Sequence, residues 1–176
     1  MRNRTIGSLV VFTTLVSACA SIDSLPDERI GEATLRLSNG VPVGTAQLLR
    51  HGDSIRLSAV VGGLEPGLHG FHLHTVGKCI APDFSSAGGH LNPGSKAHGS
   101  MSPNGSHLGD LPNLEIAGNH SATIQVDLTG SATQVMAAIF DADGSAIVVH
   151  AKADDYRTDP SGDAGSRIAC GVIEAT

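Results

Sequence analysis

Aromatic residues are scarce in this sequence, which has no tryptophan, one tyrosine and four phenylalanines among its 176 residues. Proteins that bind single-stranded nucleic acids commonly stack the bases on aromatic side chains, and this chain offers no such platform. Its hydrophobic core must be built mainly from valine, isoleucine, leucine and alanine. The scarcity therefore favours an aliphatic globular domain.

Basic residues are also few. The chain carries 11 lysines and arginines against 17 acidic residues, and its formal charge is −6. Arg2 and Arg4 lie in a segment that we expect to be removed, which makes the remainder more acidic still. A nucleic-acid partner would require a basic surface, so we expect none.

The apolar run at residues 6–18 is too short to span a bilayer. Together with Arg2 and Arg4 it predicts a secretory signal peptide at residues 1–18. The run ends in Leu-Val-Ser-Ala-Cys and resembles a bacterial lipobox, in which Cys19 would be acylated and residues 19–30 would form a tether. Ordinary cleavage at Ala-Cys-Ala is the alternative. Either route exports the protein, and the first anchors it to a membrane of the bacterial periplasm or cell envelope.

Cysteine is used only three times. If Cys19 belongs to processing, Cys79 and Cys170 remain as one pair in an exported protein, where disulfides persist. We therefore expect these two residues to be bonded. Two free thiols are the alternative.

Residues 31–176 suit one domain, and its apolar residues alternate with period two. Asn39-Gly40 and Asp143-Gly144 lie between apolar runs as turn signals. The pattern predicts an all-β antiparallel sandwich or barrel without a long helix. Eight strands are expected, namely residues 33–37, 43–49, 55–61, the strand with His72 and His74, 122–128, 135–140, 147–151 and 168–173.

Two stretches lack any sustained periodicity. Residues 77–119 contain eight glycines and four prolines, and residues 154–166 form a shorter irregular stretch. A compact domain rarely contains so long a loop unless the loop is functional or held by cross-links. We expect bound metals to organise both loops.

Histidines crowd into one part of the chain. Eight of the nine lie between His69 and His150, and His72 and His74 stand two residues apart. On a strand such a pair points to one face, where two imidazoles can bind one ion. Four histidines suit copper(II), and three histidines with a carboxylate suit zinc.

Six motifs, taken in order, resemble those of bacterial periplasmic copper,zinc superoxide dismutases over residues 31–173. They are GLHGFHLH at 67–74, GGHLNP at 88–93, KAHG at 96–99, HLGD at 107–110, VHAKADD at 149–155 and GSRIACG at 165–171. The resemblance implies an eight-stranded Greek-key β-barrel. It also implies an enzyme that dismutates superoxide to oxygen and hydrogen peroxide with a redox-active copper and a structural zinc.

The resemblance further assigns ligands, with His90 shared between the two metals and acting as a proton donor. The implied copper ligands are His72, His74, His90 and His150, and the implied zinc ligands are His90, His98, His107 and Asp110.

Other residues would act around these ligands. Asp154 would hydrogen-bond His72 and His98, and His69 would support His150. Arg167 would attract superoxide beside the copper. Cys79 and Cys170 would tie the long loop to the last strand, while His51 and His120 match no motif and are expected to be exposed loop residues.

Two rival functions remain at this point. A copper-binding protein of the same fold would bind the metals without turnover. A structural envelope lipoprotein would need only zinc to cross-link a loop. Whether the protein is a monomer or a homodimer is left open by the sequence.

Overall fold

The structure is a computed structural model in which residues 27–176 are described. The expected signal peptide, residues 1–18, and Cys19 lie outside these residues. The elements, in chain order, are β1 (Glu28–Leu37), β2 (Pro42–His51), β3 (Ser54–Gly62), β4 (Gly67–His69), β5 (Phe71–His74), the 3-10 turn η2 (Ser85–Ala87), β6 (Leu114–Ile116), β7 (Ser121–Asp127), α1 (Ala132–Ile139), β8 (Ala146–His150), β9 (Arg167–Val172) and β10 (Glu174–Ala175).

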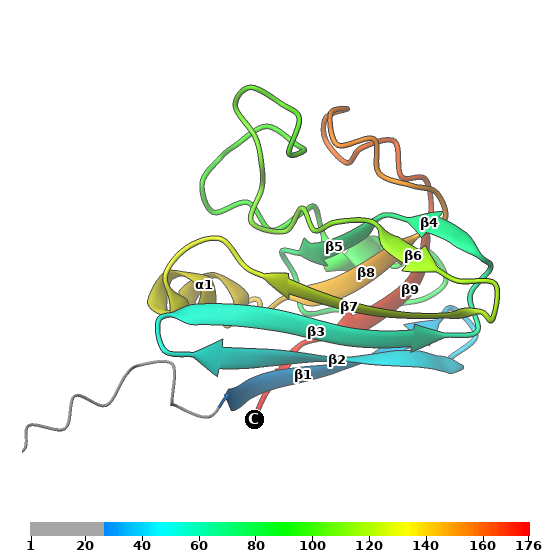
Figure 1. Cartoon of the computed structure of the whole chain (residues 1–176), viewed down its shortest axis with the longest axis horizontal. Helices are drawn as coiled ribbons and strands as arrows, with labels where there is room; N and C mark the ends of the chain where they lie inside the picture. The colour runs from blue at the N-terminus through cyan, green and yellow to red at the C-terminus, as the bar shows by residue number, and fades with distance from the viewer. Residues whose placement is uncertain (1–26) are drawn as a thin grey trace, which may run out of the picture.

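The main sheet has the strand order β5-β8-β9-β1-β2-β3-β7, with β10 paired to β1, and β4 and β6 form a second, two-stranded sheet. The named pairs of strands are antiparallel. The main sheet curls on itself, and β8 and β9 pass behind β3 and β7 in Figure 1. This arrangement confirms the expected all-β barrel.

The predicted alternation of buried and exposed residues is clearest in β3. Ile55, Leu57 and Ala59 are buried while the residues between them are more exposed. Burying one isoleucine or leucine side chain contributes about 2 kcal/mol. The larger core cluster is aliphatic apart from Phe71, which is fully buried. Gly40 adopts positive φ in the hairpin after β1 and Gly144 does so in the turn before β8, as the turn signals predicted.

Residues 135–140 were expected to form a strand, and this expectation is wrong because they belong mainly to α1. The Ser131 side chain accepts a hydrogen bond from the Gln134 main chain, and the Gln134 side chain accepts one from the Ser131 main chain. This capping box starts a helix, and the buried residues Ala132, Val135 and Ile139 follow helical spacing. The helix covers one end of the barrel in Figure 1.

Two further features differ from expectation. Strand β1 begins at Glu28, inside the expected tether. The irregular stretch 77–119 contains η2 and β6. Both long loops leave the barrel on the same side in Figure 1. Hydrogen bonds join them, such as that from the Met101 N–H to the Tyr156 carbonyl oxygen at 3.1 Å. No helix among residues 27–176 is long and apolar enough to cross a membrane.

Candidate metal centre

The first histidine cluster is built on strand β5. His72 and His74 face the same side of β5, and its pairing with β8 brings His150 to the same place. The main chain of Leu73 accepts a hydrogen bond from Leu91 (2.8 Å) and donates one to Gly109 (3.0 Å). These two bonds hold the long loop against β5 and bring His90 beside the strand, where it forms an isolated bridge with His74.

Four ring nitrogens of this cluster are buried and have no hydrogen-bond partner within residues 27–176. They are His72 Nδ1, His74 Nε2, His90 Nε2 and His150 Nε2. Buried polar atoms nearly always have a partner, so four such atoms close together indicate an absent ligand. The ligand atoms of these residues lie within 4.8 Å of one another. Four imidazole nitrogens are the donor set that copper(II) favours, and the residues fit that ion.

In each of these rings the other nitrogen makes a hydrogen bond. That bond determines which nitrogen carries the proton and which has the free lone pair. His74 Nδ1 lies 2.9 Å from the Gly88 carbonyl oxygen, and His150 Nδ1 lies 3.1 Å from that of Gly165. Because a carbonyl oxygen only accepts, each Nδ1 carries the proton and each Nε2 presents its lone pair. His72 is reversed, since its Nε2 lies 2.8 Å from Asp154 Oδ2.

The second cluster surrounds one carboxylate oxygen. His90, His98 and His107 place their Nδ1 atoms 2.8, 3.0 and 3.0 Å from Asp110 Oδ1. The other oxygen of Asp110 accepts from the main chain of Gly99 and His107, which holds the carboxylate in place. Three imidazoles and one carboxylate match the ligand set of tetrahedral zinc, and the residues fit that ion. His90 belongs to both clusters through its two nitrogens.

Burial keeps these imidazoles neutral. Desolvation lowers the pKa of His74 to about 2, of His90 to about 4 and of His150 to about 3. A neutral ring offers the lone pair that a metal requires. Burial alone would raise the pKa of Asp110, but hydrogen bonds from His90 and from the main chain of Gly99 and His107 outweigh it and lower that pKa.

Asp154 connects the two clusters. Its Oδ2 lies 2.8 Å from His72 Nε2, and its Oδ1 lies 3.0 Å from His98 Nε2. Burial opposes its charge, but hydrogen bonds from His72, His98 and the Tyr156 main chain outweigh that effect and hold its pKa at about 2. Gly162 packs over this carboxylate with φ +68°, and a Cβ there would collide with Asp154. The structure thus brings Asp154 to both rings named from the sequence.

Arg167 lines the same pocket as three histidines of the first cluster. Its guanidinium donates to the carbonyl oxygens of Phe84 and Gly88, both at 2.6 Å. With His74, His90 and His150 it lines a pocket of about 420 Å³. An anion that enters this pocket meets both the arginine and the first cluster.

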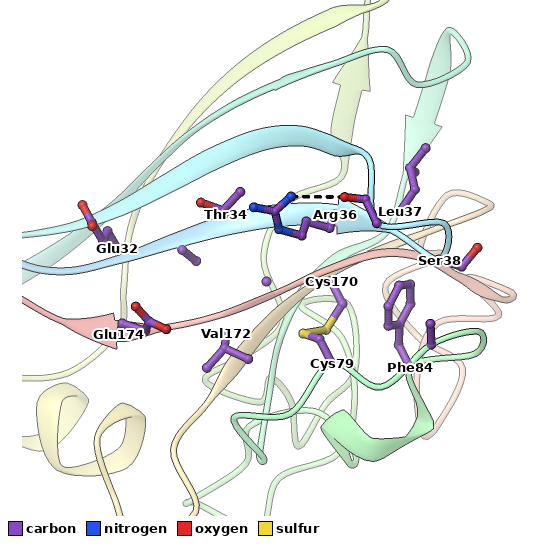
Figure 2. Close-up of a pocket in the computed structure, with 14 residues that line it drawn as sticks. Glu32, Thr34, Arg36, Leu37, Ser38, Cys79, Phe84, Cys170, Val172 and Glu174 are labelled. Atoms are coloured by element: carbon purple, nitrogen blue, oxygen red, sulfur yellow. Dashed lines mark hydrogen bonds between the residues drawn. A yellow bond between two sulfur atoms is a disulfide. The ribbon is translucent and has the colours of Figure 1, made fainter.

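A disulfide joins Cys79 to Cys170, as expected from the cysteine count. Figure 2 shows it beside the Phe84 ring, between the loop and β9. Cys170 and Phe84 belong to a small buried cluster against which Cys79 packs. The bond therefore anchors the loop that supplies the two carbonyl oxygens to Arg167.

His69 differs from its expected role. Its Nδ1 lies 2.7 Å from the main-chain oxygen of His150, and its Nε2 lies 3.0 Å from that of Glu65. It therefore holds the His150 backbone, while Gly165 orients the ring. A hydrogen bond to a main-chain oxygen cannot be recognised from the residue types in a sequence.

His51 and His120 are outside both clusters. His51 ends β2, is only partly exposed and lies 3.0 Å from Asp27, so it is a strand residue and not a loop residue. His120 is exposed, as expected, and its Nδ1 contacts the Leu64 carbonyl oxygen at 2.9 Å.

Asn113 and Tyr156, which sequence reasoning missed, both bond to Asp154.

Comparison with known proteins finds one matching family model and several similar proteins. A family model described as copper/zinc superoxide dismutase (SODC) matches residues 43–173. Superoxide dismutase (Cu-Zn) 1 of Aquifex aeolicus is 37% identical over 155 residues, covering 86% of this chain and 91% of that protein. Its counterpart in Caulobacter vibrioides is 39% identical over 148 residues, covering 81% and 84%. A crystal structure of a SOD-like protein from Bacillus subtilis has a TM-score of 0.75 and 37% identity, covering 80% of this chain and 96% of that one.

Proposed function

This chain belongs to the copper/zinc superoxide dismutase family, and from that premise we propose which of its residues bind the metals and act on the substrate. The enzyme converts two superoxide ions and two protons to oxygen and hydrogen peroxide. Bound copper supplies the electron exchange, and bound zinc supplies a fixed charge that shapes the loop.

Copper is held by the four buried nitrogens that lack a partner among residues 27–176. Zinc is held by the three Nδ1 atoms around Asp110 and by that carboxylate. The copper assignment is supported by the hydrogen bonds of the opposite ring nitrogens, which leave each lone pair pointing into the first cluster. The zinc assignment is supported by the three Nδ1 atoms that surround one Asp110 oxygen. The copper ligands are His72, His74, His90 and His150, and the zinc ligands are His90, His98, His107 and Asp110.

His90 acts as the proton donor. Its Nε2 is free within the described residues, and the ring lines the pocket that Arg167 also lines. When this nitrogen is not bound to copper it can hold a proton, which can pass to an anion that sits in this pocket. Arg167 attracts and orients that anion, because its guanidinium is fixed by the Phe84 and Gly88 carbonyl oxygens.

The single observation that carries the proposal is that four histidine nitrogens have no partner among residues 27–176, and that three of these histidines, His74, His90 and His150, line one pocket with the fixed guanidinium of Arg167. A cytochrome c competition assay, run on protein loaded with both metals and on protein loaded with zinc alone, tests it. Superoxide removal should depend on copper. Copper binding without turnover would favour the copper store, and normal function in the cell with the copper site empty would favour a structural lipoprotein.

The enzyme acts in the bacterial periplasm or cell envelope, where it removes superoxide, and Cys19 carries a lipid anchor. The basic start, the apolar run and the lipobox-like end at Cys19 support this location. Mass spectrometry of the mature N-terminus should find a lipidated Cys19, and Cys19→Ser should block that processing. An unmodified N-terminus at Ser21 would contradict the anchor.

A further inference from the structure

The main chain of Asp154 is held by one side chain from the other loop. Asn113 Nδ2 donates to the Asp154 carbonyl oxygen at 2.9 Å, and Asn113 Oδ1 accepts from the Asp154 N–H at 2.8 Å. The amide thus bonds both main-chain groups of one residue. Asp154 can neither twist nor slide without breaking at least one of these bonds.

Tyr156 completes the connection. Its hydroxyl accepts from the Asn113 N–H at 2.9 Å, and its own N–H donates to Asp154 Oδ1 at 2.6 Å. Its carbonyl oxygen accepts from the Met101 N–H at 3.1 Å. The two long loops therefore meet through Asn113, Asp154 and Tyr156, next to the carboxylate that joins the two clusters.

Asn113 lies just beyond Asp110 in the same loop, so an ordered Asp110 brings an ordered Asn113. The Asp154 carboxylate must reach His72 and His98 at once, and such contacts tolerate displacements of only about 0.5 Å. Loops are the least stable parts of a domain, so they do not by themselves supply that precision. The Asn113 amide supplies a fixed point where the carboxylate needs one.

We propose that Asn113 is a positioning residue for the Asp154 carboxylate, and that it couples the order of the Asp110 loop to the orientation of His72 and His98. The proposal deepens the proposed function and rests on it for the identity of the metals. The hydrogen bonds themselves are independent of any metal. A residue that merely cross-linked the loops would stabilise them without acting through Asp154.

The first experiment uses the metal-free, ¹⁵N-histidine-labelled protein with its complete mature chain. NMR should resolve the His72 and His98 Nε2–H protons that face Asp154, and the His74 Nδ1–H proton that faces the Gly88 carbonyl oxygen. In Asn113→Ala the first two protons should exchange with water at least about tenfold faster, while His74 stays unchanged as the internal reference. Unchanged exchange at His72 and His98 would overturn the proposal, whether or not the protein is a dismutase.

The second experiment is a double-mutant cycle on zinc retention against a chelator. Asn113→Ala alone and Asp154→Asn alone should each lower zinc affinity, by about 10- to 100-fold for Asp154→Asn. The double variant should lose no more than Asp154→Asn, because Asn113 acts through that carboxylate. Asn119→Ala is the matched control, since Asn119 makes comparable turn hydrogen bonds to Ser121 away from both clusters.

Asn113→Asp keeps the acceptor for the Asp154 N–H but replaces the donor with a carboxylate oxygen that faces the Asp154 carbonyl oxygen. It should therefore raise the exchange rate and lower the zinc affinity at least as much as Asn113→Ala. If Asn113→Ala lowers zinc affinity by the same factor in the wild-type and Asp154→Asn backgrounds, Asn113 only cross-links the loops and the proposal is wrong. If the wild type retains no zinc while the NMR result holds, the proposed metal assignment fails and the positioning role stands.

Discussion

Arg167 and Asp83 place opposite charges in one surface hollow next to the pocket. Both residues line this hollow together with Ser85 and Ser166. The Asp83 carboxylate is held by the N–H and hydroxyl of Ser85, at 3.0 and 2.9 Å. The chain as a whole is acidic, with a formal charge of −6. Attraction of superoxide therefore depends on a small local positive field that Asp83 partly cancels.

Arg167→Ala should keep both metals and the fold. It should lower the rate about tenfold or more and weaken its dependence on ionic strength, because the local positive charge is lost. Stopped-flow measurement of superoxide decay across a salt series measures both effects. Arg157→Ala is the control, since it removes the same charge from an exposed site on the neighbouring loop. A full rate with an unchanged salt dependence would refute the role of Arg167.

Asp83→Asn should act in the opposite direction. Removing the negative charge beside Arg167 should raise the rate about twofold at low ionic strength, and the gain should vanish at high salt. Asp127→Asn, which changes the net charge equally at the Arg56 ion pair on β7, should leave the rate nearly unchanged. Equal gains in both variants would mean that only the net charge matters.

At the scale of elements, the loop between Cys79 and Gly88 holds the arginine. It supplies both carbonyl oxygens that bond Arg167, and the disulfide to Cys170 fixes its start on the strand that carries Arg167. The loop is also held by η2, by the small cluster around Phe84 and by the Val76 N–H, which donates to the Ala87 carbonyl oxygen at 3.0 Å, but the disulfide is its covalent link to β9. Arg167 should therefore lose its position when the bond is opened.

Replacing Cys79 and Cys170 with serine should lower the free energy of unfolding by about 4 kcal/mol in the chain-entropy model. It should also lower the rate at conditions where the protein remains folded. Adding Arg167→Ala to this variant should then cost less than it does in the wild type, because the arginine is already displaced. Denaturant unfolding and stopped-flow kinetics measure the two effects, and additive rate losses would contradict the link.

The elements also show why some features were predictable from sequence. Strand β3 was predictable, because only one of its faces is buried and the apolar residues Ile55, Leu57 and Ala59 therefore stand at every second position. The helix α1 was missed because its apolar residues also read as a short strand, although the Ser131 and Gln134 capping box was present. The residues of both clusters could be named from their motifs. Their main-chain partners could not, because a carbonyl oxygen such as that of Gly165 has no residue-type signature.

At the scale of the whole molecule, burial keeps three of the buried histidines neutral in the metal-free protein. Their pKa values are lowered by burial, to about 2 for His74, about 4 for His90 and about 3 for His150. In the unfolded chain a histidine titrates at about 6.5. As the pH falls below that value, the unfolded chain takes up protons that the folded chain does not, so the free energy of unfolding falls.

The metal-free protein should therefore lose on the order of 3 kcal/mol of stability between about pH 7 and about pH 5.5, at no more than about 1.4 kcal/mol per histidine and pH unit. Urea unfolding across this range measures the slope. His120→Asn should leave the slope unchanged, because His120 is exposed. A metal-free protein of constant stability over this range would show that these rings are not buried in solution.

One main-chain oxygen accepts hydrogen bonds from both Arg167 and a histidine of the first cluster. The Gly88 carbonyl accepts from Arg167 at 2.6 Å and from His74 Nδ1 at 2.9 Å. Gly88 has φ +75°, and a Cβ there would press against Thr75, so other residues fit poorly. With the site residues proposed above, any change that moves this oxygen should alter anion capture and copper affinity together. A substitution that changes anion capture without changing copper affinity must therefore lie at a position such as Asp83. This residue borders Arg167 and contributes to neither histidine cluster.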